Sequence, residues 1–283
     1  MLNRFYEFTF FSNLPLALLT AWAWAFCAFL VGRAVKRHAT IDIFWGSGFL
    51  WIYLESLWFS HSQSSSSGGN WWFNSSLNGH AIRWIILGAV ALWSLRLSIH
   101  LAIRQKGSAE DSRYVWIMRG ARDGNKTIYA LRKIYGLQGL LMWFVSLPLQ
   151  WMAFATSFNF LVWVGLAIVL IGVYFEAIGD EQLRRFVANP ANSGTTMNTG
   201  LWRYTRHPNY FGDACVWVGF FICALSTKYG FITILSPTLM VWLLTSLSGK
   251  PMLEKKLSKT REGYNEYIAA TSSFFPRPPK KLS

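Results

Sequence analysis

The stretch NFLVWVGLAIVLIGVYFEAIG, residues 159–179, contains one charged side chain, Glu176, in 21 residues. An apolar block of about 20 residues is the length that an α-helix needs to cross the hydrocarbon core of a membrane. The chain continues directly into the polar segment DEQLRR at 180–185. This stretch therefore predicts a membrane-spanning helix that ends at a polar surface.

Similar apolar blocks recur along the 283 residues, of which 53% are hydrophobic and only 14% are charged. Soluble domains average about 25% charged residues, so the composition favours a polytopic all-α membrane protein with one integral membrane domain over residues 1–283. The sixth block is short, and six spans are the alternative to seven. We expect about seven spans, at about 14–32, 41–60, 82–103, 137–154, 159–179, 213–227 and 231–249.

Lysine and arginine gather on alternate sides of these spans. The segments after the first, third, fifth and seventh spans carry three, eight, four and eight of them, 23 in all, whereas Arg4, Arg83 and Lys228 fall on the opposite side. Because basic loops stay in the cytosol, this asymmetry predicts an N-out, C-in orientation. It also accounts for the net charge of +14, so we expect no nucleic-acid partner.

Neither cysteine nor histidine shows the spacing of a ligand set. Cys27, Cys215 and Cys223 all fall inside apolar blocks, and the five histidines are scattered. We therefore expect neither a disulfide framework nor a metal site.

Ionisable groups are costly within membrane spans, and four of those in the predicted spans need an explanation. They are Asp42, Glu55, Arg96 and Glu176. One interpretation is a buried ion pair in which Arg96 neutralises Asp42 or Glu55. The other is a proton donor or substrate-orienting carboxyl in an intramembrane cavity, and the two interpretations are compatible.

Two polar segments follow the fifth predicted span. Asp180 and Arg184 stand at i and i+4, which a surface salt bridge explains, while Glu176 and Asp180 share a helix face and offer acceptors for a hydroxyl or an amide. Further on, GLWRYTRHPNYFGD at 200–213 crowds cationic donors and aromatic rings before an apolar run. Planar guanidinium groups suit phosphate or carboxylate, so the pattern favours a soluble anionic ligand over an anionic-lipid anchor.

No Rossmann glycine motif, P-loop or GxSxG motif occurs in the sequence. Any nucleotide is therefore expected to bind on helices and loops rather than at a sheet.

Four stretches together resemble one family. They are RYTRHPNYFGD at 203–213, MLEKKLSKTREGYNEYIAATSSFFP at 252–276, TIDIFWGSGF at 40–49 and LWSLRLSIHLAIRQKGSAEDSRY at 92–114. This set is similar to the DUF1295 branch of the steroid 5-alpha-reductase C-terminal-like superfamily. The resemblance implies a seven-helix membrane fold that holds NADPH in a cytosol-facing cavity and takes an unsaturated lipid from the bilayer.

The same resemblance supplies the predicted cofactor residues, with the cytosolic segment 250–283 closing the site. They are Glu176, Asp180, Arg184, Arg203, Tyr204, Arg206, His207, Asn209 and Tyr210, with Glu254, Tyr264 and Tyr267 from the C-terminal segment.

Departures from the family affect the predicted chemistry. The family's glutamate on the second helix and tyrosine on the third correspond here to Asp42 and Trp93, and an indole N–H cannot act as an acid. Glu176 stands where the family has an asparagine. We therefore predict that Asp42 carries the chemistry, helped by Arg96 or Tyr53. Residues 110–114 are interpreted as a solvated charged loop in preference to a cofactor contact.

The leading hypothesis is an NADPH-dependent reductase that acts on a carbon–carbon double bond of a hydrophobic enone, steroid-like or another lipid. One alternative is an S-adenosylmethionine-dependent methyltransferase of the isoprenylcysteine carboxyl methyltransferase type. A non-catalytic lipid-binding protein is the other. By resemblance, the expected location is the endoplasmic reticulum in a eukaryote or the inner membrane in a bacterium.

Overall fold

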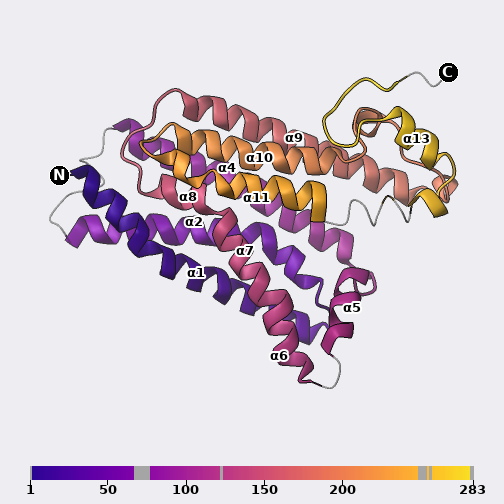
Figure 1. Cartoon of the computed structure of the whole chain (residues 1–283), viewed down its shortest axis with the longest axis horizontal. Coiled ribbons are helices and arrows are strands. Elements are labelled where there is room, and N and C mark those ends of the chain that lie inside the picture. The colour runs from indigo at the N-terminus through magenta and orange to yellow at the C-terminus, as the bar shows by residue number, and fades with distance from the viewer. Residues whose placement is uncertain (1, 67–76, 122–123, 248–253, 255–256, 281–283) are drawn as a thin grey trace. The chain divides into compact units, whose positions relative to one another are not determined.

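The described part of the chain is built from helices. A computed structural model describes residues 2–66, 77–121, 124–247, 254 and 257–280 (Figure 1), and no strand occurs within these residues. The end of the seventh predicted span, at 248–249, and much of the start of the predicted C-terminal segment, at 250–256, lie outside them. The prediction of an all-α class is confirmed.

The chain divides into two compact units. Unit 1 comprises Met1–Val162 and Cys223–Thr233, and unit 2 comprises Trp163–Ile222 and Ile234–Ser283.

Unit 1 begins with three long helices and continues with shorter ones. They are α1 (Leu2–Ala34), α2 (Thr40–Ser66), α4 (Leu77–Gln105), α5 (Ser112–Met118), η1 (Arg119–Ala121), α6 (Lys126–Ala130), η2 (Leu131–Gly136), α7 (Leu137–Val145), α8 (Leu147–Ala153) and η5 (Gly230–Thr233).

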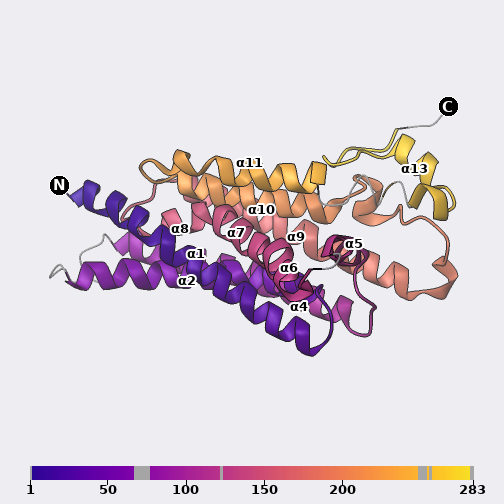
Figure 2. The ribbon, with the colours of Figure 1, turned by 60° about the horizontal axis from the view of Figure 1, so that its bottom comes forward.

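The core of unit 1 lies between its long helices. Four alanines, Ala17, Ala21, Ala25 and Ala28, recur at helical spacing on α1, and all are buried. Small side chains on one face let helix backbones approach closely, and α1 runs beside α2 and α7 in both views (Figure 1, Figure 2). The larger side chains of this core come from α2 and α4, and the buried ring of Trp93 is one of them.

Unit 2 contains most of two long helices and the C-terminal segment. Its helices are α9 (Leu161–Ala188), η3 (Pro190–Asn192), η4 (Gly200–Arg203), α10 (Pro208–Leu225), α11 (Leu235–Trp242), η6 (Leu243–Leu247) and α13 (Tyr264–Ala270).

Glycines bring the backbones of α9 and α10 into contact. Gly165, Gly172 and Gly179 recur every seven residues on α9, and Gly212 and Gly219 have the same spacing on α10. A Cβ atom added to Gly212 would lie 2.6 Å from the carbonyl oxygen of Gly172, and one added to Gly219 would lie 2.7 Å from that of Gly165. Larger residues are therefore excluded along this crossing, which fixes how the two helices meet.

Among the residues that the structure describes, four helices are long and apolar enough to cross a membrane, namely Thr9–Ala34, Gly79–Gln105, Leu161–Ala188 and Pro208–Leu225. They correspond to the first, third, fifth and sixth predicted spans. The predicted span 41–60 lies within α2, and 231–249 is distributed over η5, α11 and η6. The total of seven spans and the N-out orientation stay predictions.

The predicted span 137–154 is divided between α7 and α8 at Ser146. Pro148 occupies the first turn of α8. Proline has no N–H to donate and its ring clashes with the preceding turn, so the helix cannot continue regularly through this point.

Candidate functional site

The close crossing of α9 and α10 joins two polar side chains of unit 2. Asp180 follows Gly179 on α9, and Asn209 lies in the first turn of α10, which opens with Pro208. The Asn209 amide donates to Asp180 Oδ1 at 3.3 Å, and Asn209 Oδ1 accepts the backbone N–H of Tyr210 at 3.0 Å. The structure thus brings together two predicted cofactor residues that are 29 positions apart.

The guanidinium of Arg206 is buried, and its donors bond to the protein itself. Its Nε donates to Glu254 Oε1 at 3.0 Å, and one terminal nitrogen donates to the carbonyl oxygens of Ile268 and Thr271 at 3.0 and 2.7 Å. His207 Nε2 lies 2.9 Å from the same Glu254 oxygen. Arg206 therefore holds the C-terminal segment, and it also satisfies carbonyls at the end of α13, where a cation is favoured by the helix dipole.

The neighbours of Glu254 lower the pKa of its carboxyl. Burial alone would raise the pKa of its carboxyl, but hydrogen bonds from Arg206 and His207 outweigh burial and lower the pKa below its ordinary value of 4.5. Glu254 is thus held as a carboxylate at neutral pH, where it forms a buried ion pair with Arg206.

Backbone bonds continue the attachment of the C-terminal segment. The N–H of Arg206 donates to Ser272 O at 2.9 Å, and the Tyr267 hydroxyl donates to Trp202 O at 2.5 Å. The ring of Tyr264 lies 5.8 Å from that of Tyr267, centroid to centroid. The predicted proximity of Glu254, Tyr264 and Tyr267 to the 200–213 stretch is therefore observed.

The polar face of unit 2 that stays open to solvent lies beside this cluster. Arg203 and Tyr204 are exposed, and the rings of His207 and Tyr210 stack in parallel at 5.2 Å. Burial leaves Glu176 only 3% exposed on α9. Of the predicted cofactor residues that the structure describes, Arg184, Arg203 and Tyr204 are thus the most accessible to a ligand.

The predicted salt bridge between Asp180 and Arg184 is replaced by another pair. Arg184 bonds Glu181 at 2.6 Å, and Arg185 bonds the same carboxylate. Asp180 is instead turned toward Asn209 and is 8% exposed. Its short side chain is committed to the helix crossing, so the exposed arginine pairs with the longer, exposed glutamate.

In unit 1, Asp42 lies in the first turn of α2 and is held by two residues of α5. The Tyr114 hydroxyl donates to Asp42 Oδ1 at 2.5 Å, and Arg113 donates to Oδ2 at 2.7 Å. Tyr114 is only 3% exposed, whereas the Arg113 side chain is 45% exposed. A phenol and a guanidinium thus converge on one carboxylate.

Residues 110–114 are therefore ordered against α2, and their interpretation as a solvated loop is wrong. Both oxygens of Glu110 accept backbone N–H groups that precede α2, from His38 at 2.5 Å and Ala39 at 3.0 Å. Glu110 thus supplies acceptors for the two N–H groups immediately before α2, which would otherwise need other partners.

The pKa values of Tyr114 and Asp111 are consistent with these hydrogen bonds. Burial, with the nearby Asp42 carboxylate, raises the pKa of the Tyr114 hydroxyl, so it stays protonated. Burial would raise the pKa of Asp111, but hydrogen bonds from Arg113 outweigh it and lower the pKa.

The other predicted catalytic residues are placed differently. Tyr53 is buried, and its hydroxyl donates to the Arg83 carbonyl at 3.3 Å. It lies 11 residues after Asp42 on the same helix, roughly 16 Å along the axis, so the two do not form one site. Arg96 is half-buried on α4, and the cation that forms the salt bridge with Asp42 is Arg113.

Sequence reasoning missed Tyr114 and Arg113 as partners of Asp42. Asp111, which caps the start of α5 by accepting the N–H of Arg113 at 2.8 Å, signals where this short helix begins but not what it packs against. The docking of α5 against α2 joins residues 72 positions apart, and no local pattern encodes that.

The donor set of unit 2 fits a phosphate-bearing nucleotide. Exposed Arg203 and Tyr204 suit phosphate pairing and stacking, whereas Asp180 and Asn209 are bonded to each other across the helix crossing. Because Arg206 is committed to Glu254 and to backbone carbonyls, it does not belong to the donors available for phosphate.

Comparisons with known proteins extend over most of the chain. The family described as "Protein of unknown function (DUF1295)" matches residues 28–271. An uncharacterized protein of Schizosaccharomyces pombe is 24% identical over 214 residues, which cover 66% of this chain and 61% of that protein. The chain thus spans about three fifths of the length of this curated relative. No solved structure matches.

Proposed function

Because this chain belongs to the DUF1295 family, and because a buried phenol is bonded to the carboxylate of Asp42, we propose that it is a membrane oxidoreductase. Its proposed reaction is the NADPH-dependent reduction of a carbon–carbon double bond in a hydrophobic enone. The observation that carries the proposal is the hydrogen bond from Tyr114 to Asp42, at 2.5 Å. Tyr114 thus places a phenol beside the Asp42 carboxylate. The position that corresponds to the family tyrosine holds Trp93 instead.

Reduction of an enone adds a hydride to the β-carbon and a proton to the α-carbon. NADPH, when bound, supplies the hydride. The chain must then polarise the carbonyl oxygen and deliver the proton. When Asp42 carries a proton, it can donate to the Tyr114 oxygen, which leaves the phenol hydrogen available for a carbonyl oxygen. The proton thus moves from the carboxyl through the phenol to the carbonyl oxygen, which together with the hydride at the β-carbon gives an enol. The enol then tautomerises to the saturated ketone, in which the α-carbon has gained the proton and the oxygen has lost it.

The raised pKa of Tyr114 suits this role, since a phenol that stays protonated remains a hydrogen-bond donor at neutral pH. Arg113 contributes a fixed positive charge at the same carboxylate. This charge favours the anionic form of Asp42 after it has given up its proton.

Unit 2 supports the nucleotide side of the proposal. Arg203 would pair with phosphate, and the bonded pair of Asp180 and Asn209 would lie beside polar groups of the cofactor. Arg206, His207 and Glu254 would shape the site by fixing the C-terminal segment.

The apolar helices support a membrane-embedded protein, and the proposed substrate is accordingly a lipid taken from the bilayer. We place the protein in the endoplasmic reticulum if its host is a eukaryote and in the inner membrane if its host is a bacterium.

Cofactor binding is tested by the melting temperature of the detergent-purified protein with NADPH, NADH or S-adenosylmethionine. A ligand that binds the native state raises its stability by mass action. We expect NADPH to raise the melting temperature, Arg203→Ala to reduce this shift, and Lys259→Ala, which changes another exposed cation of unit 2, to leave it unchanged. A shift with S-adenosylmethionine alone would favour methyl transfer, and no shift with any of the three would favour a non-catalytic lipid binder.

The chemical step is tested by NADPH oxidation with a panel of hydrophobic enones. We expect Tyr114→Phe and Asp42→Asn each to lower kcat by roughly 10²-fold or more, the contribution of a positioned general acid. NADPH binding should persist in both variants. Tyr129→Phe, a tyrosine of α6, serves as the control. Turnover by Tyr114→Phe at the wild-type rate would remove the phenol from the proposed reaction.

A further inference from the structure

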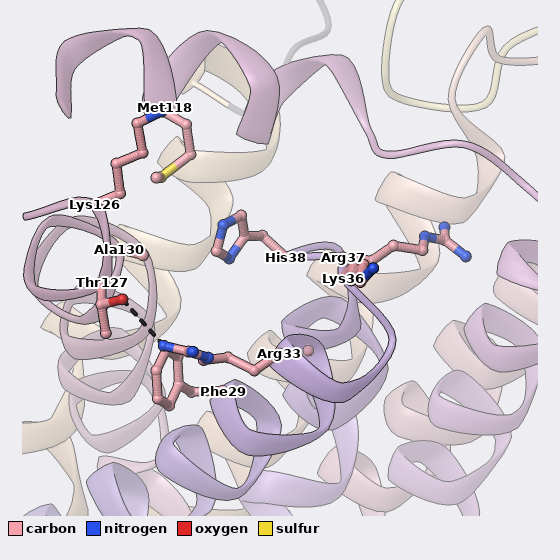
Figure 3. A pocket seen from close by; sticks show the side chains of 10 residues that line it. Phe29, Arg33, Lys36, Arg37, His38, Met118, Lys126, Thr127 and Ala130 are labelled. Carbon is pink, nitrogen blue, oxygen red and sulfur yellow. Dashed lines mark hydrogen bonds between the residues drawn. The ribbon is translucent and has the colours of Figure 1, made fainter. Parts of the chain in front are cut away.

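A cationic pocket lies at the end of α1, apart from Asp42. Its volume is about 310 Å³, and it is lined by α1, the turn that follows it, α5 and α6 (Figure 3). Four basic residues, Arg33, Lys36, Arg37 and Lys126, contribute to its lining, and none of the lining residues is acidic.

Three of these four cations are available to the pocket. Arg37 extends away from the other labelled side chains in Figure 3, and its guanidinium donates to Gln105 O at 2.7 Å and to Ala109 O at 3.2 Å. Arg33 reaches across the pocket to the hydroxyl of Thr127 at 3.1 Å (Figure 3). The ammonium groups of Lys36 and Lys126 have no hydrogen-bond or ion-pair partner within the residues that the structure describes.

Lys36 occupies a conformation that favours glycine. Its φ angle is 55°, in the left-handed region that costs a residue with a Cβ atom about 1 kcal/mol or more. This position follows the end of α1, where glycine is the usual residue. The lysine therefore brings a cation to the pocket at a backbone cost that glycine would avoid.

The pocket continues into an aromatic stripe on α1. Trp22, Phe26 and Phe29 precede Arg33 at helical spacing, and Phe26 and Trp22 are 48% and 43% exposed. The rings of Phe26 and Phe29 stack at 5.7 Å, and the Arg33 guanidinium lies 5.9 Å from the centre of the Phe29 ring. One helix thus presents exposed apolar rings that lead directly to a cationic end.

The position of the pocket favours a lipid over a soluble anion. It lies at the C-terminal end of Thr9–Ala34, a helix long and apolar enough to cross a membrane. The pocket is therefore expected at the level of the lipid headgroups, with the aromatic stripe at the level of the acyl chains. A basic pocket between membrane helices is suited to a phosphate headgroup.

We propose that this pocket binds the phosphate headgroup of an anionic glycerophospholipid, with Arg33, Lys36 and Lys126 pairing with phosphate and an acyl chain lying along Trp22 and Phe26. The site is independent of the proposed reductase reaction, because it uses neither Asp42 nor Tyr114.

The test is native mass spectrometry of the full chain in neutral detergent, titrated with dioleoyl phosphatidic acid or dioleoyl phosphatidylcholine. We expect phosphatidic acid to bind more tightly. Because each Lys or Arg near an anionic lipid contributes on the order of fivefold in affinity, Lys36→Gln/Lys126→Gln should weaken its binding by roughly 30-fold. Neither ammonium carries a bond that the fold requires, so the variant should fold.

The matched control is Lys106→Gln/Lys133→Gln, which removes two exposed cations of unit 1 outside the pocket. This double variant should bind phosphatidic acid within about twofold of wild type, since its cations lie elsewhere. An equal loss in both double variants would show diffuse charge attraction and overturn the site. Equal binding of the two lipids would also overturn it, and competition by glycerol 3-phosphate as effective as by phosphatidic acid would assign the pocket to a soluble phosphate instead.

Discussion

Arg206 shows how a single buried cation organises unit 2. It is 9% exposed, and it bonds Glu254 and two carbonyl groups near the end of α13. A buried ion pair contributes little net stability by itself, but loss of one partner leaves a buried charge without compensation. Arg206 and Glu254 are therefore expected to be sensitive positions for folding whatever ligand unit 2 binds.

Glu254→Gln should lower the stability of the protein in a pH-dependent way. At neutral pH we expect a loss of about 1.5–3 kcal/mol, the contribution of hydrogen bonds to charged groups. The folded pKa of Glu254 is lowered from 4.5, so the stabilisation is fully present above pH 4.5 and is lost as the pH falls through the folded pKa below it. Arg206, His207, Tyr264 and Tyr267 are titratable groups that interact with this carboxyl.

The measurement is the melting temperature of wild type and Glu254→Gln in detergent over a series of pH values. The difference between them should be constant near neutrality and should shrink below pH 4.5. A difference that grows on acidification would contradict a lowered pKa.

At the scale of the element, the crossing of α9 and α10 depends on glycine. The backbones touch at Gly172 and Gly212, so the positions of Asp180 and Asn209 follow from the geometry of the crossing. A side chain inserted there would meet backbone atoms of the facing helix as well as the side chain of Glu176 or Val216. The polar pair is thus maintained by residues that carry no functional group.

Gly212→Ala should therefore destabilise the protein, although alanine is the better helix former. A Cβ atom there would lie 2.6 Å from Gly172 O and 2.8 Å from the Glu176 backbone nitrogen. Such overpacking costs about 1–3 kcal/mol. Gly88→Ala on α4 is the control, since nothing lies within 4 Å of its added Cβ. We expect a lower melting temperature for Gly212→Ala only, and equal values for both variants would refute the close crossing.

The start of α2 depends on Glu110 in a comparable way. Its carboxylate accepts N–H groups of His38 and Ala39. Loss of a side-chain cap costs about 0.5–2 kcal/mol, so Glu110→Ala should lower the melting temperature and Glu110→Gln, which keeps one acceptor oxygen, should lower it less. An unchanged melting temperature in Glu110→Ala would show that water replaces the cap without loss.

At the scale of the whole molecule, the charge distribution predicts how the chain is inserted. The C-terminal segment and the loops at 104–136 and 180–212 carry 20 of the 27 basic residues. Both the nucleotide site proposed in unit 2 and the cationic pocket of unit 1 use residues from segments predicted to be cytosolic. Orientation is therefore the property on which access of a cytosolic cofactor depends.

This orientation is testable with cysteine labelling in sealed vesicles. Cys27, Cys215 and Cys223 would be replaced by alanine, and single cysteines introduced by Lys280→Cys or Lys228→Cys, both at exposed positions. A membrane-impermeant maleimide should label the Lys280→Cys variant from the cytosolic side and the Lys228→Cys variant from the opposite side. Labelling of both from one side would contradict the predicted arrangement of the last spans.

The features that the sequence alone predicted correctly depend on residues that are close together in the chain. Long apolar blocks must form helices to satisfy their backbone groups in a membrane, so the all-α class and four of the candidate spans followed from composition and length. The proline at position 148, which interrupts the predicted span 137–154, is a local signal of the same kind. The family was identified from motifs that are contiguous in the sequence, such as RYTRHPNYFGD at 203–213.

Only the tertiary structure decided which groups meet. Tyr114 reaches Asp42 across 72 positions, and Glu254 reaches Arg206 across 48. Whether a cation meets a ligand or a carboxylate depends on which helices pack together, and hydropathy and charge counts contain no information on that packing. The sequence by itself thus determined a helical membrane protein with a donor-rich polar segment. Only the fold decided that Arg206 bonds to the C-terminal segment and that the Tyr114 hydroxyl bonds to Asp42. The physical reason is that hydrogen bonds depend on distances that the packing of the helices sets.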